Sequence, residues 1–140
     1  MSAQGFNPMR WKCETRGCYN LKHRPKIEVF ADVWPGKISM GDVDGIVEIA
    51  GNALMLEWKT ETSKLPTGQK IMYTRITNGK RITVISVCGN AETMEVSGYK
   101  VFFNGREVPS AGWRKIDLPG LKLKLKAWCD WAQKNPRISA

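Results

Sequence analysis

Apolar and polar residues alternate most regularly between Gly41 and Lys59, and this pattern predicts a β-hairpin. Strand-forming or apolar residues fill most of positions 46–49 and 53–58, and Gly51-Asn52 lies between the two runs. Two-residue hairpin turns with glycine in the first central place use the positive φ that glycine adopts without strain. We therefore expect Gly51 and Asn52 to form the turn.

The expected turn fixes which residues of the two strands lie opposite each other. Ala50 would pair with Ala53, and further along the hairpin Asp44 would pair with Lys59. Side chains alternate between the two faces of a strand, so one face is apolar and suits a core. The core face holds Val43, Gly45, Val47, Ile49, Leu54, Leu56 and Trp58, and the charged face holds Asp44, Ile46, Glu48, Met55, Glu57 and Lys59.

Apolar residues at helical spacing predict one helix before the hairpin and one after it. The first runs from Pro25 to Trp34 and is followed by Pro-Gly, with a strand from Glu28 to Trp34 as the alternative. The second begins near Pro66 and ends at Asn78-Gly79 with a left-handed cap. The chain therefore begins as helix, hairpin and helix.

The second half of the chain predicts further strands and a final helix. Residues 81–88 are rich in β-branched residues, as in a strand covered on both faces, and the crossover helix would make this strand parallel to the second arm of the hairpin. Asn104-Gly105 predicts a second hairpin, which we expect at the periphery. Apolar residues three and four apart predict a helix from Pro119 to Asn135.

Length and charge narrow the class of protein. The 140 residues suit a single domain, which we expect to consist of a Cys-containing segment (1–24), a core (25–90), and a hairpin with a basic C-terminal helix (91–140). The net charge of +9 favours a polyanionic partner such as nucleic acid. No apolar run approaches the ~20 residues of a membrane span, and no signal-peptide pattern is present. We expect a cytoplasmic protein without a membrane partner.

Cysteine and histidine near the N-terminus allow a structural zinc site. The spacing Cys13-x4-Cys18-x4-His23 supplies three ligands, and Cys88 or Cys129 would be the fourth. Alternatively, the cysteines are reduced thiols that behave as small apolar residues, and the histidine lies on the surface.

The charged face of the hairpin allows two interpretations. In the first, Asp44 and Lys59 form a cross-strand ion pair worth at most ~1 kcal/mol, and the other carboxylates are solvated. In the second, Asp44 and Glu57 are diagonal neighbours that hold Mg²⁺ or Mn²⁺, and the backbone carbonyl of Trp58 is a further ligand. Lys59 would then stabilise charge on a phosphate or position the attacking water. The second interpretation describes phosphodiester hydrolysis.

Asp44, followed on the opposite strand by Glu57-Trp58-Lys59, resembles the motif of the PD-(D/E)XK nuclease superfamily. Gln69-x-x-x-Tyr73 is similar to a helix motif of several members. The chain looks most like the virus-type replication-repair (VRR-NUC) nucleases and the archaeal-type Holliday junction resolvases. The resemblance covers about Pro25 to Cys88 and implies an α/β, restriction-endonuclease-like core with a mixed β-sheet flanked by helices in the order αβββαβ. It implies Asp44, Glu57, Lys59 and Gln69 as catalytic residues.

Two positions leave the metal ligands open. The residue before Asp44 is not the proline of the family motif, and Asp42 is an alternative ligand because alternation would point it to the same face. The acidic residue of the family's first helix would fall on Glu28 by position.

The resemblance implies a Mg²⁺-dependent DNA endonuclease, specific for branched DNA or Holliday junctions in recombination or repair, that acts as a homodimer. A phage-encoded enzyme acting in the host cytoplasm is one form of this expectation. The candidates for contacts with the DNA backbone are Lys64, Lys70, Lys122, Lys124 and Lys126. The alternative is a non-catalytic DNA- or RNA-binding protein with a nuclease-like fold. An RNA-binding module would stack bases on Trp11, Trp113, Trp128 or Trp131.

Overall fold

The computed structural model describes residues 25–60 and 64–137. The chain divides into two compact units between Asp42 and Val43. The expected zinc ligands Cys13, Cys18 and His23 lie outside the described residues, and the single domain expected over residues 1–140 stays a prediction.

In the first unit, the described residues form a single turn of 3-10 helix, η1 (Ile27–Phe30), where the sequence predicts an α-helix from Pro25 to Trp34. No residue of η1 is buried, and Val29 is 70% exposed. Isolated helices of this length are marginal unless an apolar side packs against another element. Apolar spacing alone was therefore not enough, and the predicted α-helix and the alternative strand are both wrong.

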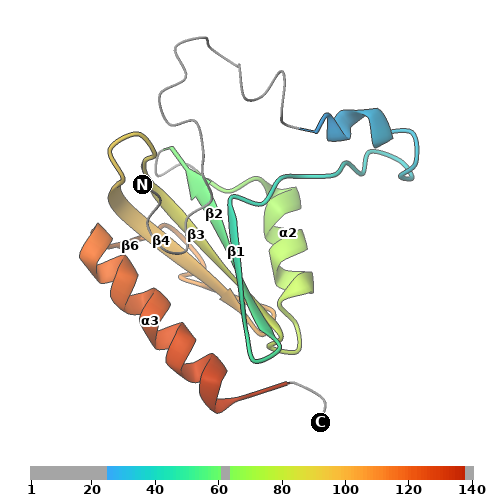
Figure 1. The fold of residues 1–140 in the computed structure, drawn as a ribbon. Helices are drawn as coiled ribbons and strands as arrows, with labels where there is room; N and C mark the ends of the chain where they lie inside the picture. Colours follow the sequence, from blue (N-terminus) through green and yellow to red (C-terminus); the bar gives the residue numbers. More distant parts are fainter. Residues whose placement is uncertain (1–24, 61–63, 138–140) are drawn as a thin grey trace, which may run out of the picture. The chain divides into compact units, whose positions relative to one another are not determined.

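The second unit is a mixed six-stranded sheet with one helix on each face, as Figure 1 shows. The strands lie in the order β1-β2-β3-β4-β5, and β6 pairs with β4. Among the described strands, only the β2–β3 pair is parallel. The elements are β1 (Gly45–Ile49), β2 (Asn52–Lys59), α2 (Thr67–Ile76), β3 (Ile82–Asn90), β4 (Glu95–Phe103), β5 (Arg106–Val108), β6 (Arg114–Lys115) and α3 (Leu118–Lys134). None of the helices in the described part of the chain has the length and apolarity needed to cross a membrane.

The turn of the first hairpin is Ala50-Gly51, and the predicted turn Gly51-Asn52 is wrong. Both central residues have a positive φ, 53° and 85°, as a type I′ turn requires. Asn52 is the first residue of β2, and its buried side-chain amide donates hydrogen bonds to the carbonyls of Ala132 and Asn135 at the end of α3. This contact with distant residues favours the observed turn over the one that local preference suggests.

The new turn shifts the pairing register but leaves the two faces of the hairpin unchanged. Ile46 pairs with Met55 where the sequence predicts Glu57, and Gly45 pairs with Leu56. A shift of two residues keeps each side chain on its own face, because the side-chain repeat of a strand is also two. The predicted grouping of the strand side chains by face is therefore confirmed, whereas the predicted pairs are wrong. The face expected to be only charged is also covered by α2, where Met55 packs and Glu57 is nearly buried.

The other elements largely follow the prediction. Helix α2, strand β3 parallel to β2, the hairpin at Asn104-Gly105 and helix α3 are all confirmed. The expectation that the second hairpin is peripheral is wrong, because its first strand, β4, pairs with β3, β5 and β6. The surrounding strands bury the middle of β4.

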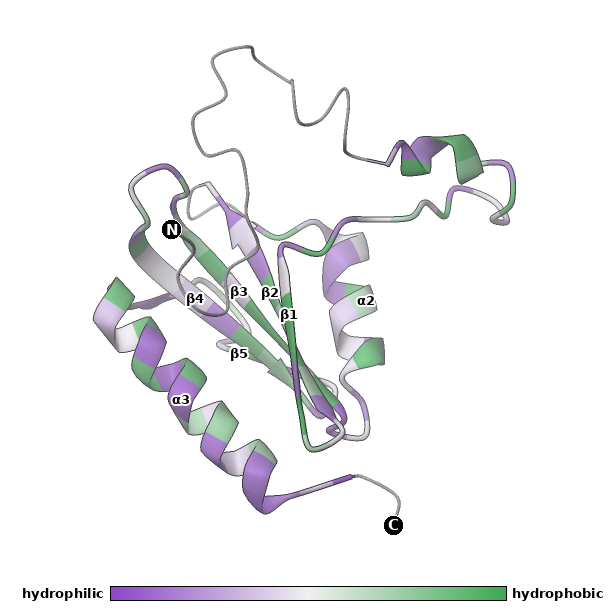
Figure 2. Ribbon diagram, viewed as in Figure 1, coloured by the Kyte–Doolittle hydropathy of each residue, from purple (hydrophilic) through white to green (hydrophobic). Residues whose placement is uncertain are grey.

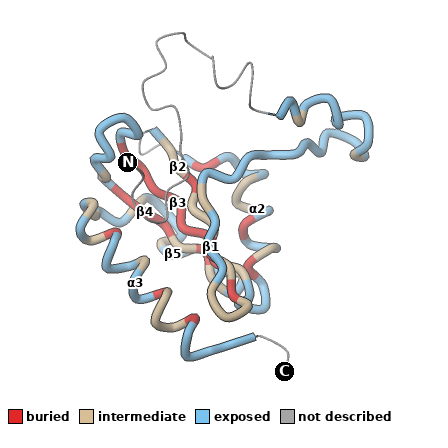
Figure 3. The backbone as a smooth tube through the Cα atoms, in the orientation of Figure 1, coloured by how far each residue is buried: buried red, intermediate tan, exposed pale blue. Residues whose placement is uncertain are grey.

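Two apolar clusters lie on the two faces of the sheet. The cluster under α3 contains Leu54, Ile85, Val87, Leu121, Trp128 and Ala132, and the cluster under α2 contains Leu65, Tyr73, Val84 and Phe102. Strand β3 contributes to both clusters, so it is hydrophobic in Figure 2 and buried along most of its length in Figure 3. This explains its nearly continuous apolar sequence.

The α/β class and the mixed sheet are thus confirmed in the second unit. Among the described residues, two strands precede α2 where the order αβββαβ requires three, and η1 replaces the first helix. The restriction-endonuclease-like core stays a prediction.

Candidate active site

The structure brings Asp44 and Glu57 to opposite positions at one end of the first hairpin. Gly45 pairs with Leu56, so Asp44, one residue before β1, lies across from Glu57 on β2. Opposite residues on antiparallel strands have Cβ atoms ~5 Å apart. The register therefore puts Asp44 opposite Glu57, where the sequence predicts a diagonal arrangement. The described ion pairs do not include the predicted pair between Asp44 and Lys59.

The side chain of Asp44 is anchored to the backbone of β2. Asp44 Oδ2 accepts a hydrogen bond from the Trp58 N–H at 2.7 Å. Strand β1 begins only at Gly45, so no backbone carbonyl of β1 accepts from the Trp58 N–H. The Asp44 carboxylate accepts this hydrogen bond instead. The N–H and C=O of one strand residue point to the same edge, so the Trp58 carbonyl also faces the Asp44 side of β2. The Asp44 side chain and the Trp58 carbonyl therefore lie along the same edge of β2.

Glu57 lies under α2 beside Tyr73. Its side chain is on the sheet face that α2 covers, with Glu57 9% exposed and Tyr73 1% exposed. Burial raises the pKa of Tyr73 well above its usual value, and the negative charges of Glu57 and Asp44 and a hydrogen bond to Glu57 raise it further. The phenol is thus protonated at neutral pH and donates to the Glu57 carboxylate. The charges of both Asp44 and Glu57 therefore act on the Tyr73 hydroxyl group.

Two buried oxygen atoms on β3 and α2 have no hydrogen-bond partner among the described residues. One is Ser86 Oγ on β3, in the position paired with Glu57, and the other is Gln69 Oε1, one turn before Tyr73 on α2. An unsatisfied buried oxygen is unfavourable by about 1–3 kcal/mol. Such groups are expected where water or a ligand completes the hydrogen bonding. The surroundings of Glu57 therefore have capacity for a polar ligand.

Lys100 continues this row of side chains across the sheet. It pairs with Ser86 on β3 and is 2% exposed. Its Nζ donates to Glu107 Oε2 at 2.9 Å and to the Pro109 carbonyl at 3.0 Å, and it lies 5.5 Å from the centroid of the Trp113 ring. Lys100 is thus a fixed buried cation on the same face as Glu57.

Lys59 lies beside a buried thiol at the end of β2. Its partner on β3 is Cys88, which is fully buried. Burial raises the pKa of Cys88 to about 11, and the nearby Lys59 and Lys100 partly oppose the shift. Cys129 is a free thiol, and the described residues contain no group of three His, Cys, Asp or Glu side chains suited to a metal. The zinc prediction stays untested, because its main ligands are outside the described residues.

The predicted DNA-contact residues lie on two different faces of the sheet. Helix α3 covers the face of the sheet opposite Glu57. The structure therefore does not bring the lysines of α3, Lys122, Lys124 and Lys126, to the Asp44–Glu57 pair. Lys124 lies over the Tyr99 ring at 5.7 Å, and Lys126 pairs with Asp130 at 2.9 Å. Lys64 and Lys70 lie on the α2 side, just before α2 and in its second turn.

Two predicted acids lie outside the second unit. Asp42 is the last residue of the first unit, and Glu28 lies in η1. The alternation that favoured Asp42 as a ligand applies only from the start of β1 at Gly45. Asp44 also precedes β1, but its hydrogen bond to the Trp58 N–H holds it at β2 beside Glu57, and the choice between Asp42 and Asp44 as metal ligand stays a prediction.

Sequence reasoning missed Ser86 and Lys100. Both are single polar residues inside apolar strand segments, VISVC and YKVFF. Buried polar residues need partners, so a serine or lysine on the expected inner face of a strand was an available signal. The missing information was which face of β3 and β4 lies under α2.

In comparisons with known proteins, no family model, no curated protein and no solved structure matches this chain. The fit of a metal ion therefore depends on the donors alone. Asp44 uses one carboxylate oxygen for the Trp58 N–H, and a carboxylate such as Glu57 has several acceptor positions beyond the one that Tyr73 uses. Hard oxygen donors from one or two carboxylates suit Mg²⁺, which keeps several of its waters. The residues fit such an ion.

Proposed function

We propose that this protein is a metal-dependent nuclease that hydrolyses DNA phosphodiester bonds at the Asp44–Glu57 pair. The observation that supports the proposal most strongly is the position of Glu57. It is a nearly buried carboxylate, opposite Asp44, hydrogen-bonded to Tyr73 and flanked by Lys59. A structural sheet face has no need of two adjacent carboxylates beside unsatisfied buried oxygens.

Each residue of the site has a role in this proposal. Asp44, Glu57 and the Trp58 carbonyl would hold Mg²⁺ or Mn²⁺, which when bound polarises a phosphate oxygen and lowers the pKa of water. Lys59 stabilises negative charge that develops on the phosphate or orients the attacking water. Tyr73 fixes the position of the Glu57 carboxylate. Gln69, with its buried side-chain oxygen, orients a water or a substrate group.

The substrate is inferred from charge and from the motif. A net charge of +9 favours a polyanion, and the motif Asp44 with Glu57-Trp58-Lys59 resembles that of nucleases acting on DNA in recombination and repair. We infer branched DNA as the preferred substrate and a homodimer as the active form on this resemblance. Lys64 and Lys70, on the α2 side, are the favoured candidates for phosphate contacts.

A cleavage assay tests the proposal. The protein is incubated with branched, duplex and single-stranded DNA in Mg²⁺, Mn²⁺ or EDTA, alongside Glu57→Gln and Lys59→Met. We expect metal-dependent cleavage that falls by at least about 100-fold in both variants. Glu48→Gln is the matched control, because it makes the same change on the same face of the hairpin and keeps an acceptor for the Gly51 N–H.

Two outcomes contradict the proposal. Cleavage that survives in Glu57→Gln would come from another site or a contaminant. Binding without cleavage in every condition favours the non-catalytic nucleic-acid-binding protein.

A further inference from the structure

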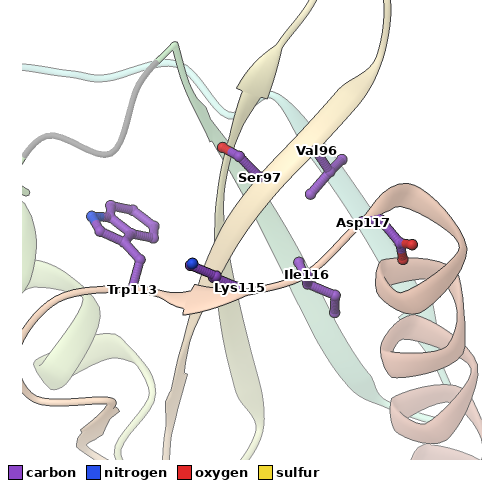
Figure 4. Close-up of a pocket in the computed structure, with 6 residues that line it drawn as sticks. All are labelled: Val96, Ser97, Trp113, Lys115, Ile116 and Asp117. Atoms are coloured by element: carbon purple, nitrogen blue, oxygen red, sulfur yellow. The ribbon is translucent and has the colours of Figure 1, made fainter.

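A cavity opens where β6 meets β4, toward the edge of the sheet away from β1. It is lined by Val96, Ser97, Trp113, Lys115, Ile116 and Asp117. Figure 4 shows the Trp113 ring standing at one end, the Lys115 side chain beside it, and the start of α3 at the other end. An aromatic ring next to an exposed ammonium group is a combination that recognises a base and its phosphate.

The Trp113 ring is held in place before any ligand binds. Lys100 lies over the ring, and its own position is fixed by Glu107 and by the Pro109 carbonyl. The ring also packs against the apolar cluster under α2, and part of its surface stays exposed to the cavity. A pre-positioned aromatic ring loses little conformational entropy when it stacks on a ligand.

The charge around the cavity suits an anionic ligand. Lys115 and its neighbour Arg114 are exposed. Asp117, the acidic residue in the lining, is the N-cap of α3 and accepts a hydrogen bond from the Gly120 N–H at 2.9 Å. The positive end of the helix therefore offsets its charge. Ser97 adds a hydroxyl group that donates to the Cys88 carbonyl and can still accept a hydrogen bond.

The cavity lies on a line of paired residues that leads to the proposed active site. Glu57 pairs with Ser86, Ser86 pairs with Lys100, and Arg114 pairs with Tyr99, which puts Trp113 next to Lys100. Three strand spacings span about 14 Å. Bases stacked at about 3.4 Å would cover this distance with about four nucleotides. Ser86 and Lys100 on this direct line are buried, so a strand that joins the two places passes around the covered face and needs more than four nucleotides.

We propose that this cavity binds an unpaired nucleobase of the DNA strand that is cleaved, stacked on Trp113, with the adjacent phosphate beside Lys115. This inference rests on the proposed function for the choice of DNA as the ligand. A base within a duplex is stacked on both sides and cannot use the ring, so the cavity selects DNA that has a single-stranded region.

A binding assay tests this site separately from cleavage. Fluorescence anisotropy in EDTA measures the affinity of Glu57→Gln protein for a single-stranded oligonucleotide and for a blunt duplex of the same length. Adding Trp113→Ala should weaken single-strand binding by about 5- to 150-fold and leave duplex binding within about twofold. Trp113→Phe, which keeps an aromatic ring, should restore most of the affinity. Lys115→Ala should reduce the salt dependence of single-strand binding, and Lys134→Ala on the last turn of α3 is the charge-matched control.

The possible results separate the two proposals. Unchanged single-strand binding in a Trp113→Ala protein with a wild-type thermal transition overturns the nucleobase site, and so does an equal loss for both DNAs. If Trp113→Ala unfolds, the comparison of Trp113→Phe with Trp113→Leu decides, and equal affinities overturn the site. If the wild type never cleaves DNA but binds single strands in a Trp113-dependent way, the nuclease proposal fails and the nucleobase site stands.

Discussion

Removing the hydroxyl group of Tyr73 tests whether this residue positions the Glu57 carboxylate. Tyr73→Phe deletes only the oxygen that donates to Glu57 and keeps the ring, which contacts Phe102 edge-on at a centroid distance of 5.2 Å. The substitution therefore opens no cavity of consequence. A hydrogen bond to a charged acceptor contributes about 1.5–3 kcal/mol, so we expect the free energy of unfolding at pH 7 to fall by this amount.

The pH dependence gives a second, independent signature. The pKa of Tyr73 in the folded protein is raised above its unfolded value of 10.0, mainly by burial. The stability that depends on the protonated phenol is fully present below pH 10 and is lost as the pH rises further, because the unfolded state then ionises first. Phenylalanine has no such proton. The difference in stability between the two proteins should therefore be largest at neutral pH and narrow above pH 10.

Urea denaturation followed by circular dichroism, at pH 7 and in steps from pH 9 to 11, measures both effects. Cys88 titrates in part of the same range but is present in both proteins, so it cancels in the comparison. Tyr99→Phe is the control, because the Tyr99 hydroxyl makes no hydrogen bond among the described residues. A loss below about 0.5 kcal/mol at pH 7, or a difference that does not narrow above pH 10, would refute the proposed link between Tyr73 and Glu57.

Three further predictions follow from the fold. Ala50→Asn should raise the free energy of unfolding by about 0.5–1 kcal/mol in urea denaturation, because Ala50 has a φ of 53° that asparagine tolerates better; a loss of stability would contradict the observed turn. Glu107→Gln should lower the free energy of unfolding by about 3 kcal/mol, because it leaves the buried Lys100 ammonium without its carboxylate partner. Lys100→Met should lower it by less, because Lys70 still lies 3.8 Å from Glu107. A larger loss for Lys100→Met than for Glu107→Gln would contradict this account of the ion pair. Alkylation of Cys88, followed by peptide mass spectrometry, should be at least about 100-fold slower in the folded protein than in urea, since burial raises its pKa to about 11; equal rates would show that the thiol is accessible.

Much of the second unit follows from local sequence patterns. The period of two in the first hairpin predicts both of its faces, and the β-branched run at 81–88 predicts a strand buried on both sides. The faces were robust because an error of two residues in register does not exchange them. The same error made Lys59 the predicted partner of Asp44, whereas the observed register puts Glu57 there.

The parts that sequence did not predict depend on distant contacts. The turn at Ala50-Gly51 is favoured by Asn52, whose side chain binds the end of α3 far along the chain. Similarly, the roles of Ser86 and Lys100 depend on which face of the sheet α2 covers. Helical spacing from Pro25 to Trp34 gave only the single turn η1, none of whose residues is buried.

Binding of Mn²⁺ tests the central claim, that Asp44 and Glu57 form one site for a divalent metal ion. The Mn²⁺ signal in electron paramagnetic resonance falls when the ion binds protein, so a titration gives the number of sites and their affinity. We predict one site in the wild type that is lost in Asp44→Asn and in Glu57→Gln and is kept in Lys59→Met and Glu48→Gln. Unchanged Mn²⁺ binding in both Asp44→Asn and Glu57→Gln would contradict the account.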